Sequence, residues 1–87
     1  MKIKQGFMLR EVAGNFVVVA VGEASKKFNG VINLNESGAF LWKQLISETT
    51  MDKLLEVLLN EYEVSEEVAK NDIEKFVNKL KEADILE

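Results

Sequence analysis

The spacing of the apolar residues changes near Asn35, and this change constrains the fold more than any other feature of the chain. Before Asn35, apolar residues form short alternating or continuous runs between glycines, which is typical of short strands. After Asn35, they recur at intervals of three and four residues, which is typical of amphipathic helices. Because strands and helices are segregated along the chain, the pattern predicts an α+β fold.

The first part of the chain predicts three short strands joined by turns. Glycines stand at positions 6, 14, 22, 30 and 38, a spacing that suits such an arrangement. The second strand is apolar on both faces, so we expect it in the centre of the sheet. A turn at Ala13-Gly14-Asn15 and a polar loop at Gly22–Asn29 separate the strands. The predicted strands are Gly6–Val12, Phe16–Val21 and Gly30–Leu34.

The second part predicts three helices, Glu36–Ser47, one that starts after Thr49, and Glu66–Ala83. Asn35, Thr49 and Ser65 are the expected N-caps. Ile85 and Leu86 are expected to pack back onto the core. The predicted buried stripes are Gly38, Leu41, Trp42 and Leu45; Met51, Leu54, Leu55, Leu58, Leu59 and Tyr62; and Ala69, Ile73, Phe76, Val77, Leu80 and Ala83. Three antiparallel strands followed by three helices match a winged helix-turn-helix-like arrangement, and we expect residues 1–87 to form a single domain.

The residue types present argue against catalysis. The 87 residues include no histidine and no cysteine, which removes the usual nucleophile pairs and zinc ligands. No phosphate-binding glycine motif is present. Most of the 15 carboxylates lie in predicted helix first turns or opposite the apolar stripes, where they act as caps and solvated surface. We therefore expect no catalytic residues, no metal site, no cofactor and no enzymatic activity.

The charge distribution bears on the class of partner. Residues 1–30 carry five basic and two acidic side chains, a balance of +3, whereas residues 31–87 carry six against thirteen, a balance of −7. A winged-helix nucleic-acid-binding regulator is an alternative function, but it needs a basic recognition helix. The predicted third helix has four lysines against five acids. The pattern therefore disfavours nucleic acid as a partner.

The chain shows no membrane-directed segment. Its first five residues lack the apolar stretch of a signal peptide, and its longest apolar run, Phe16–Val21, is far shorter than the ~20 residues that span a bilayer. Together with the absence of cysteine, this favours the reducing cytoplasm and no membrane partner.

The predicted third strand is a candidate binding element because it lies at the edge of a three-stranded meander. It contains neither Lys nor Pro, the residues that commonly protect exposed edges. Two interpretations remain: the edge is harmless because it is short, or it accepts a peptide strand. The candidate residues on this strand are Val31, Ile32, Asn33 and Leu34.

One edge of the predicted third helix is a second candidate element. Lys75 and Lys79 are four residues apart, and Val68 and Asp72 follow the same edge. These side chains are either ordinary surface charge or a face for a partner. Phe76, beside them, is either a core residue or an apolar contact for a ligand.

The segment that begins at Gly30, together with later parts of the chain, resembles a known protein family. The segment Gly30–Trp42 is similar to the strand-to-helix segment of the pyrroloquinoline quinone biosynthesis protein D (PqqD) family, also called the RiPP precursor peptide recognition element. The resemblance covers the chain from about residue 5 onward, without insertion or deletion. Further matching features are Thr49-Thr50, the Leu-rich second helix, Tyr62-Glu63-Val64, Asp72-Ile73, Phe76, Leu80 and Ile85-Leu86.

The resemblance implies a free-standing peptide-binding adaptor. Members of this family bind the leader segment of a ribosomally made precursor peptide and present it to a modifying enzyme, often a radical SAM enzyme. The leader joins the sheet beside the third strand, against the third helix. A structural subunit of a larger enzyme is a further alternative, and the pattern is compatible with a monomer or an oligomer.

Overall fold

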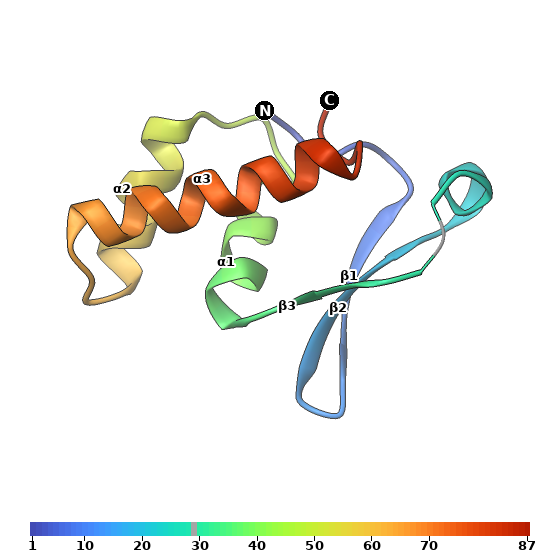
Figure 1. The fold of residues 1–87 in the computed structure, drawn as a ribbon, viewed down its shortest axis with the longest axis horizontal. Helices are drawn as coiled ribbons and strands as arrows, with labels where there is room; N and C mark the ends of the chain where they lie inside the picture. Colours follow the sequence, from blue (N-terminus) through green and yellow to red (C-terminus); the bar gives the residue numbers. More distant parts are fainter. Residues whose placement is uncertain (29) are drawn as a thin grey trace.

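A three-stranded antiparallel sheet and three α-helices form the part of the chain that the computed structural model describes, residues 1–28 and 30–87 (Figure 1). The predicted α+β class and the order of elements are therefore confirmed. The elements are β1 Phe7–Val12, β2 Asn15–Ala20, the 3₁₀ helix η1 Gly22–Lys26, β3 Ile32–Leu34, α1 Glu36–Gln44, α2 Met51–Glu61 and α3 Glu66–Glu82.

The central position of β2 is confirmed by the strand order β1-β2-β3. β1 and β2 form a hairpin whose two-residue turn, Ala13-Gly14, has positive φ angles of 52° and 82°. Positive φ at both central residues defines the type I′ turn, which matches the twist of the flanking strands. This turn makes Val12 and Asn15 the last facing pair of the hairpin.

The third strand is shorter than predicted. It begins at Ile32 and not at Gly30, because β2 offers it only the partners from Phe16 to Val18. Val31 therefore lies just before the strand. The loop before it contains η1, which the sequence did not predict, and Asn29 at its end lies outside the described residues.

Contacts with the N-terminal segment correct two predicted helix ends. α1 ends at Gln44 and not at Ser47, and the carbonyl of Leu45 accepts a hydrogen bond from the Ile3 amide at 2.9 Å. Thr49 is not the cap of α2, because its amide and carbonyl both bond to Met1, at 2.9 and 2.7 Å. Thr50 is the cap instead, and its hydroxyl accepts from the Lys53 amide.

The predicted core is largely confirmed. Trp42 is 1% exposed and anchors α1, and Ile85 and Leu86 pack back as expected, with Leu86 bridging to Ile3. Asn35 and Ser65 cap α1 and α3 as predicted. Met51 is the exception, since it is 38% exposed at the start of α2. The buried hydrophobic cluster consists of Ile3, Val18, Leu41, Trp42, Leu45, Leu54, Leu58, Ala69, Ile73, Phe76, Val77, Leu80, Ile85 and Leu86.

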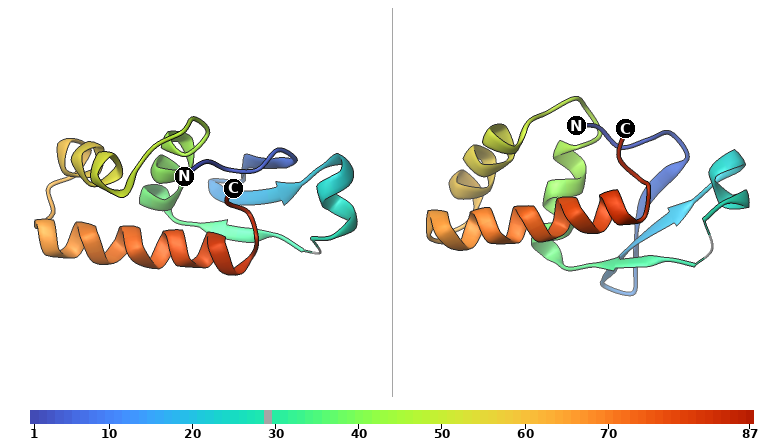
Figure 2. Two further views of the ribbon diagram at one scale, coloured as in Figure 1. Left: turned by 90° about the horizontal axis from the view of Figure 1, so that it is seen from above. Right: turned by 45° about the horizontal axis from the view of Figure 1, so that its top comes forward.

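The longest helix, α3, runs beside the open edge of β3, and the first turn of α1 closes one end of the space between them (Figure 2). Within the described part of the chain, β3 has a neighbouring strand, β2, on one side only. No helix in this part is long and apolar enough to cross a membrane. The fold thus places a short, free strand edge against a long helix.

Candidate binding groove

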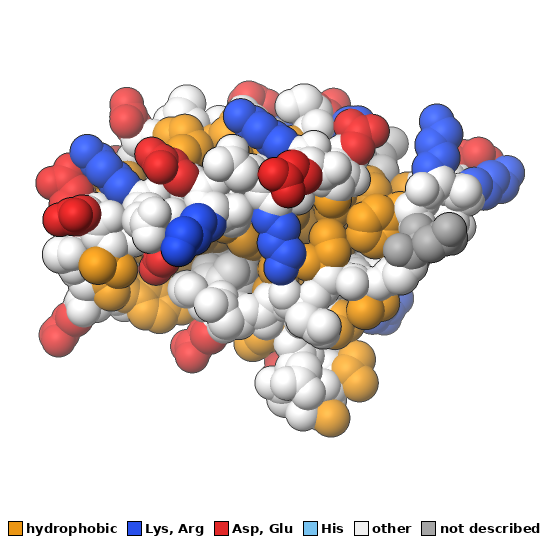
Figure 3. All heavy atoms as spheres, in the orientation of Figure 1, with side chains coloured by type: hydrophobic (Ala, Val, Ile, Leu, Met, Phe, Trp, Pro, Cys, Tyr) orange, Lys and Arg blue, Asp and Glu red, His pale blue; other side chains and the backbone are white. Residues whose placement is uncertain are grey.

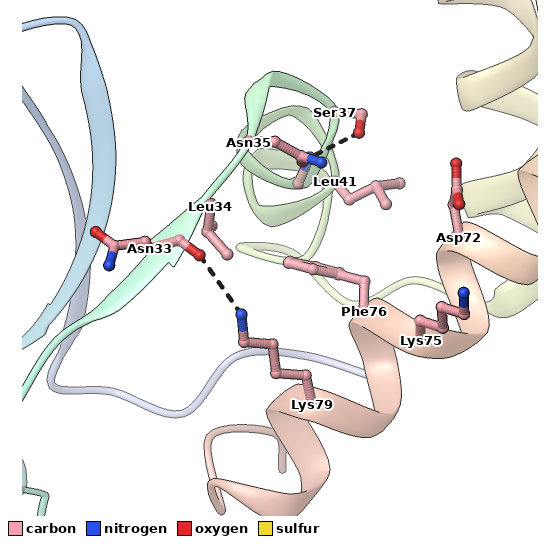
Figure 4. Close-up of a pocket in the computed structure, with 10 residues that line it drawn as sticks. Asn33, Leu34, Asn35, Ser37, Leu41, Asp72, Lys75, Phe76 and Lys79 are labelled. Atoms are coloured by element: carbon pink, nitrogen blue, oxygen red, sulfur yellow. Dashed lines mark hydrogen bonds between the residues drawn. The ribbon is translucent and has the colours of Figure 1, made fainter.

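A hollow of about 270 Å³ opens between β3, the start of α1 and the middle of α3, and we call it the first hollow (Figure 4). Its volume suits one or two side chains, since small-molecule sites usually exceed it. It brings together segments that lie some forty residues apart in the sequence. The lining residues are Asn33, Leu34, Asn35, Ser37, Gly38, Leu41, Asp72, Lys75, Phe76 and Lys79.

The base of the first hollow is apolar. The ring of Phe76 points from α3 toward Leu34, and Leu41 lies beside them (Figure 4). Phe76 is only 8% exposed and belongs to the core cluster, so it is a core residue that also lines the hollow. The two sequence-based interpretations of Phe76 are therefore compatible.

Gly38 lets the start of α1 approach this base closely. A Cβ atom at Gly38 would lie 3.0 Å from Asn35 Oδ1 and 3.4 Å from the Leu34 Cβ. Asn35 Oδ1 accepts hydrogen bonds from the Gly38 amide at 2.7 Å and from the Ser37 hydroxyl at 3.1 Å. The cap thus holds the first turn of α1 against the end of β3.

The direction of the β3 backbone follows from the hairpin. The type I′ turn makes Val12 and Asn15 a hydrogen-bonded pair, and such pairs alternate along an antiparallel ladder. Asn15, Val17 and Val19 of β2 therefore direct their backbone groups toward β1. Phe16 and Val18 direct theirs toward β3, where they face Leu34 and Ile32.

Asn33 is consequently the β3 residue whose amide and carbonyl point away from the sheet. An independent contact agrees, since Lys79 Nζ lies 3.5 Å from the Asn33 carbonyl oxygen (Figure 4). This distance is long for a hydrogen bond, and the Lys79 side chain is exposed. The ammonium therefore covers this carbonyl only weakly.

The lysines and Asp72 stand at the opening of the hollow. Lys75, Lys79 and Asp72 are all exposed residues of α3. Two lysines against one carboxylate make this opening positive, although the chain as a whole has a net charge of −4.

Three of the nine predicted site residues do not line the first hollow. Val31 is 56% exposed and precedes β3, and Ile32 packs on the core with its backbone directed toward β2. Val68 is 48% exposed, one helical turn before Asp72, and lines a separate shallow depression on α3. The roles of all nine residues in binding stay predictions.

Sequence reasoning missed the contribution of α1 to the hollow. Asn35, Ser37, Gly38 and Leu41 line it, whereas the sequence pattern assigns Asn35 only to a cap and Gly38 and Leu41 only to a buried stripe, and gives Ser37 no role. The signal was present, because an N-cap that directly follows a strand brings the first helical turn to the end of that strand.

The two residues with shifted side-chain pKa values, Tyr62 and Asp84, lie outside the first hollow. Burial, together with the charges of Glu36 and Glu61, raises the pKa of Tyr62, and the hydrogen bond from Lys4 lowers the pKa of Asp84. Neither residue lines the first hollow.

Residues 1–28 and 30–87 contain no group of three or more His, Cys, Asp or Glu that could hold a metal ion. The groove offers backbone groups, an apolar base and ammonium groups, which are contacts for an extended peptide.

Comparison with known proteins gives one family and two similar folds. The family model described as "Coenzyme PQQ synthesis protein D (PqqD)" matches residues 7–86. The structure "TbiB1 in Complex with the TbiA(beta) Leader Peptide" is 18% identical, with a TM-score of 0.77 over 100% of this chain and 95% of that chain. "Lasso peptide synthetase B1 complexed with the leader peptide" is 21% identical, with a TM-score of 0.72 over 93% of this chain and 89% of that chain. No curated protein matches significantly.

Proposed function

The chain belongs to the PqqD family, and we propose that it binds the leader segment of a ribosomally synthesised precursor peptide by strand addition to β3. The observation that carries this proposal is the Asn33 backbone, which points away from the sheet beside the first hollow. The two similar folds were both solved with leader peptides, which supports the same class of ligand here.

Backbone pairing alone is too weak to explain such binding. The Asn33 amide and carbonyl can make two hydrogen bonds, and each contributes a net ~0.5–1.5 kcal/mol, or ~1–3 kcal/mol together. Ordering a flexible peptide costs ~2–5 kcal/mol or more. Side-chain contacts must therefore supply the remainder. Leu34, Leu41 and Phe76 offer an apolar anchor point, and Lys75 and Lys79 can pair with acidic side chains of the leader.

The chain then acts as an adaptor that presents the bound leader to a modifying enzyme, and a radical SAM enzyme is the class that the family resemblance suggests. It contributes binding and no chemical step of its own. Since precursor peptides are made on ribosomes, the proposal places the chain in the cytoplasm. Nucleic acid is a poor partner, because residues 31–87 carry a balance of −7.

Titration with a leader peptide tests the proposal. The probe is the leader encoded by a precursor gene next to the gene for this chain, added to the full isotope-labelled chain. Amide chemical-shift changes should concentrate on residues 32–38 and 72–79, with a dissociation constant of about 1 nM to 1 µM. Changes centred on α2 or β1, or none with any neighbouring precursor, would contradict the proposal.

A further inference from the structure

A second hollow, of about 340 Å³, lies beyond the other end of β3. It is formed by η1, the segment before β1 and the C-terminal end of α3. Hydrophobic surface continues along the seam between α3 and β3 toward the end of the molecule that carries η1 (Figure 3). The lining residues of this second hollow are Lys4, Gln5, Phe7, Glu23, Ala24, Lys26, Lys27, Phe28, Ala83 and Asp84.

Close packing holds this hollow in shape. The rings of Phe7 and Phe28 meet edge to face, with centroids 5.5 Å apart and an interplanar angle of 87°. Gly6 has a φ of +96°, and a Cβ there would lie 2.7 Å from the Ala24 Cβ, so only glycine lets η1 approach this closely. The Val21 amide also donates to the Gly6 carbonyl at 2.7 Å.

The second hollow carries an excess of positive charge. Lys4 pairs with Asp84 at 2.6 Å, and Lys26 pairs with Glu23 at 3.2 Å. Lys27 has no carboxylate within salt-bridge distance among the residues that the structure describes. The first hollow also has one more lysine than carboxylates. Both ends of the open β3 edge are therefore positive on a chain whose net charge is −4.

The direction of a bound peptide decides which of its ends meets each hollow. Leu34 lines the first hollow and Phe28 the second. A peptide that runs antiparallel to β3 reaches the first hollow with its N-terminal part and the second with its C-terminal part. β3 is three residues long, so at ~3.3 Å per residue the two contact points lie at least about three peptide residues apart.

We propose that the bound leader continues past β3 into the second hollow, where it places an apolar side chain against Phe28 and an acidic side chain beside Lys27. This inference rests on the proposed function, because it requires a peptide strand on β3. It adds a selective contact: the leader carries two apolar residues, one for each hollow, and the C-terminal one has an acidic neighbour.

Charge reversal with selected peptides tests the acidic contact. Peptides of about twelve residues, long enough to cover both hollows at ~3.3 Å per residue, are selected from a random display library on the full wild-type chain. Each selected peptide is then compared with a version in which the Asp or Glu nearest its C-terminus is replaced by Asn or Gln. The wild type should bind the acidic form about two- to fivefold more tightly, as for an exposed ion pair.

The Lys27→Glu variant should lose or reverse this preference. Lys53→Glu is the matched control, because it makes the same change in net charge on α2, away from both hollows, and should keep the preference. Melting temperatures verify that both variants are folded.

A spin label at either end of the peptide tests the direction. The C-terminal label should broaden amide signals of residues 23–28 and 83–84, and the N-terminal label those of residues 35–41. Peptides that bind without the acidic preference, or whose C-terminal label broadens only residues 35–41, overturn the inference and leave the proposed function standing. Failure to select any peptide overturns both.

Discussion

The sheet has two free edges in the described part of the chain, one on β1 and one on β3, and they differ in what lies beside them. β1 is six residues long and β3 only three, so β1 presents the longer row of backbone groups. The start of β1 also borders a hollow of about 510 Å³, larger than the first and second hollows, which we call the β1 hollow. Its lining residues are Lys2, Ile3, Lys4, Gln5, Phe7, Met8, Leu9, Trp42, Lys43 and Ile46.

Beside β3, by contrast, runs α3, whose 17 residues extend for ~25 Å. Helix and strand together form a groove with two sides, and hollows lie at both ends of β3. Beyond the β1 hollow, the free edge of β1 continues to the exposed residues Arg10, Glu11 and Val12, which lie outside that hollow. Under the proposed function, neither the length of a free edge nor the volume of a hollow selects the binding strand. What distinguishes β3 is that α3 runs beside the strand itself, whereas α1 supplies Trp42 and Lys43 only to the hollow at the start of β1.

The largest effect should come from a substitution in the hydrophobic core, which supports the whole sheet and therefore both of its free edges. Trp42 is 1% exposed, so Trp42→Ala should cost ~3–5 kcal/mol of stability and abolish binding by unfolding the chain. Denaturant unfolding followed by circular dichroism measures this. Ile46→Ala is the control, because Ile46 is 58% exposed and its loss should cost well under ~1 kcal/mol. Equal stabilities of the two variants would show that Trp42 does not support the sheet.

Proline substitutions test the two edges directly. Asn33→Pro removes the amide that points away from the sheet and should weaken leader binding about two- to tenfold while the fold is kept. Glu11→Pro is the matched change on β1, since the same register directs the Glu11 amide away from β2, and binding should be unchanged. Calorimetric titration of both variants makes the comparison. Weaker binding by Glu11→Pro alone would assign the peptide to β1.

A proline at Ile32, the residue before Asn33, tests which β3 amides face β2 and which point away from it. The Ile32 amide faces β2, so Ile32→Pro removes a hydrogen bond within the sheet and should lower the melting temperature more than Asn33→Pro does. If Ile32→Pro melts at the wild-type temperature and Asn33→Pro does not, the assigned backbone direction is wrong.

Charge reversal at single lysines sharpens the comparison between the first hollow, beside β3, and the β1 hollow. Lys79→Glu should weaken binding of an acidic leader about two- to fivefold, and added salt should reduce the difference because the pair is exposed. Lys43→Glu makes the same charge change at the β1 hollow and should leave the affinity unchanged. Titrations at low and high salt measure both. Equal losses for the two variants would mean that only the overall charge matters.

The smallest effect concerns the exposed Lys4–Asp84 pair in the second hollow. The hydrogen bond and charge of Lys4 lower the pKa of Asp84, so the pair stabilises the folded chain above the usual pKa of an aspartate. This contribution is lost as the pH falls through the lowered folded-state pKa. Asp84→Asn should therefore melt slightly below the wild type at neutral pH, and the difference should vanish in acid. A difference that grows in acid would contradict the sign of the shift.

Much of the fold was predictable because it depends on local spacing. The caps Asn35 and Ser65 and the buried stripe of α3 follow from residues within a few positions of one another. The predictions failed where a distant segment intervened. Thr49 is held out of α2 by Met1, and α1 ends early where Ile3 bonds to Leu45, and no local pattern reveals either contact.

The sequence by itself determined the order of strands and helices, the main core residues and the candidate elements of the site, since hydrophobic periodicity and capping act over short distances. Only the tertiary structure decided that Asn33 is the outward-facing residue of β3, because this direction depends on pairing with β2 and on the turn that begins the hairpin. The structure alone also brings Leu34, Leu41 and Phe76 into one hollow, because the packing of α3 beside β3 joins segments that the sequence keeps far apart.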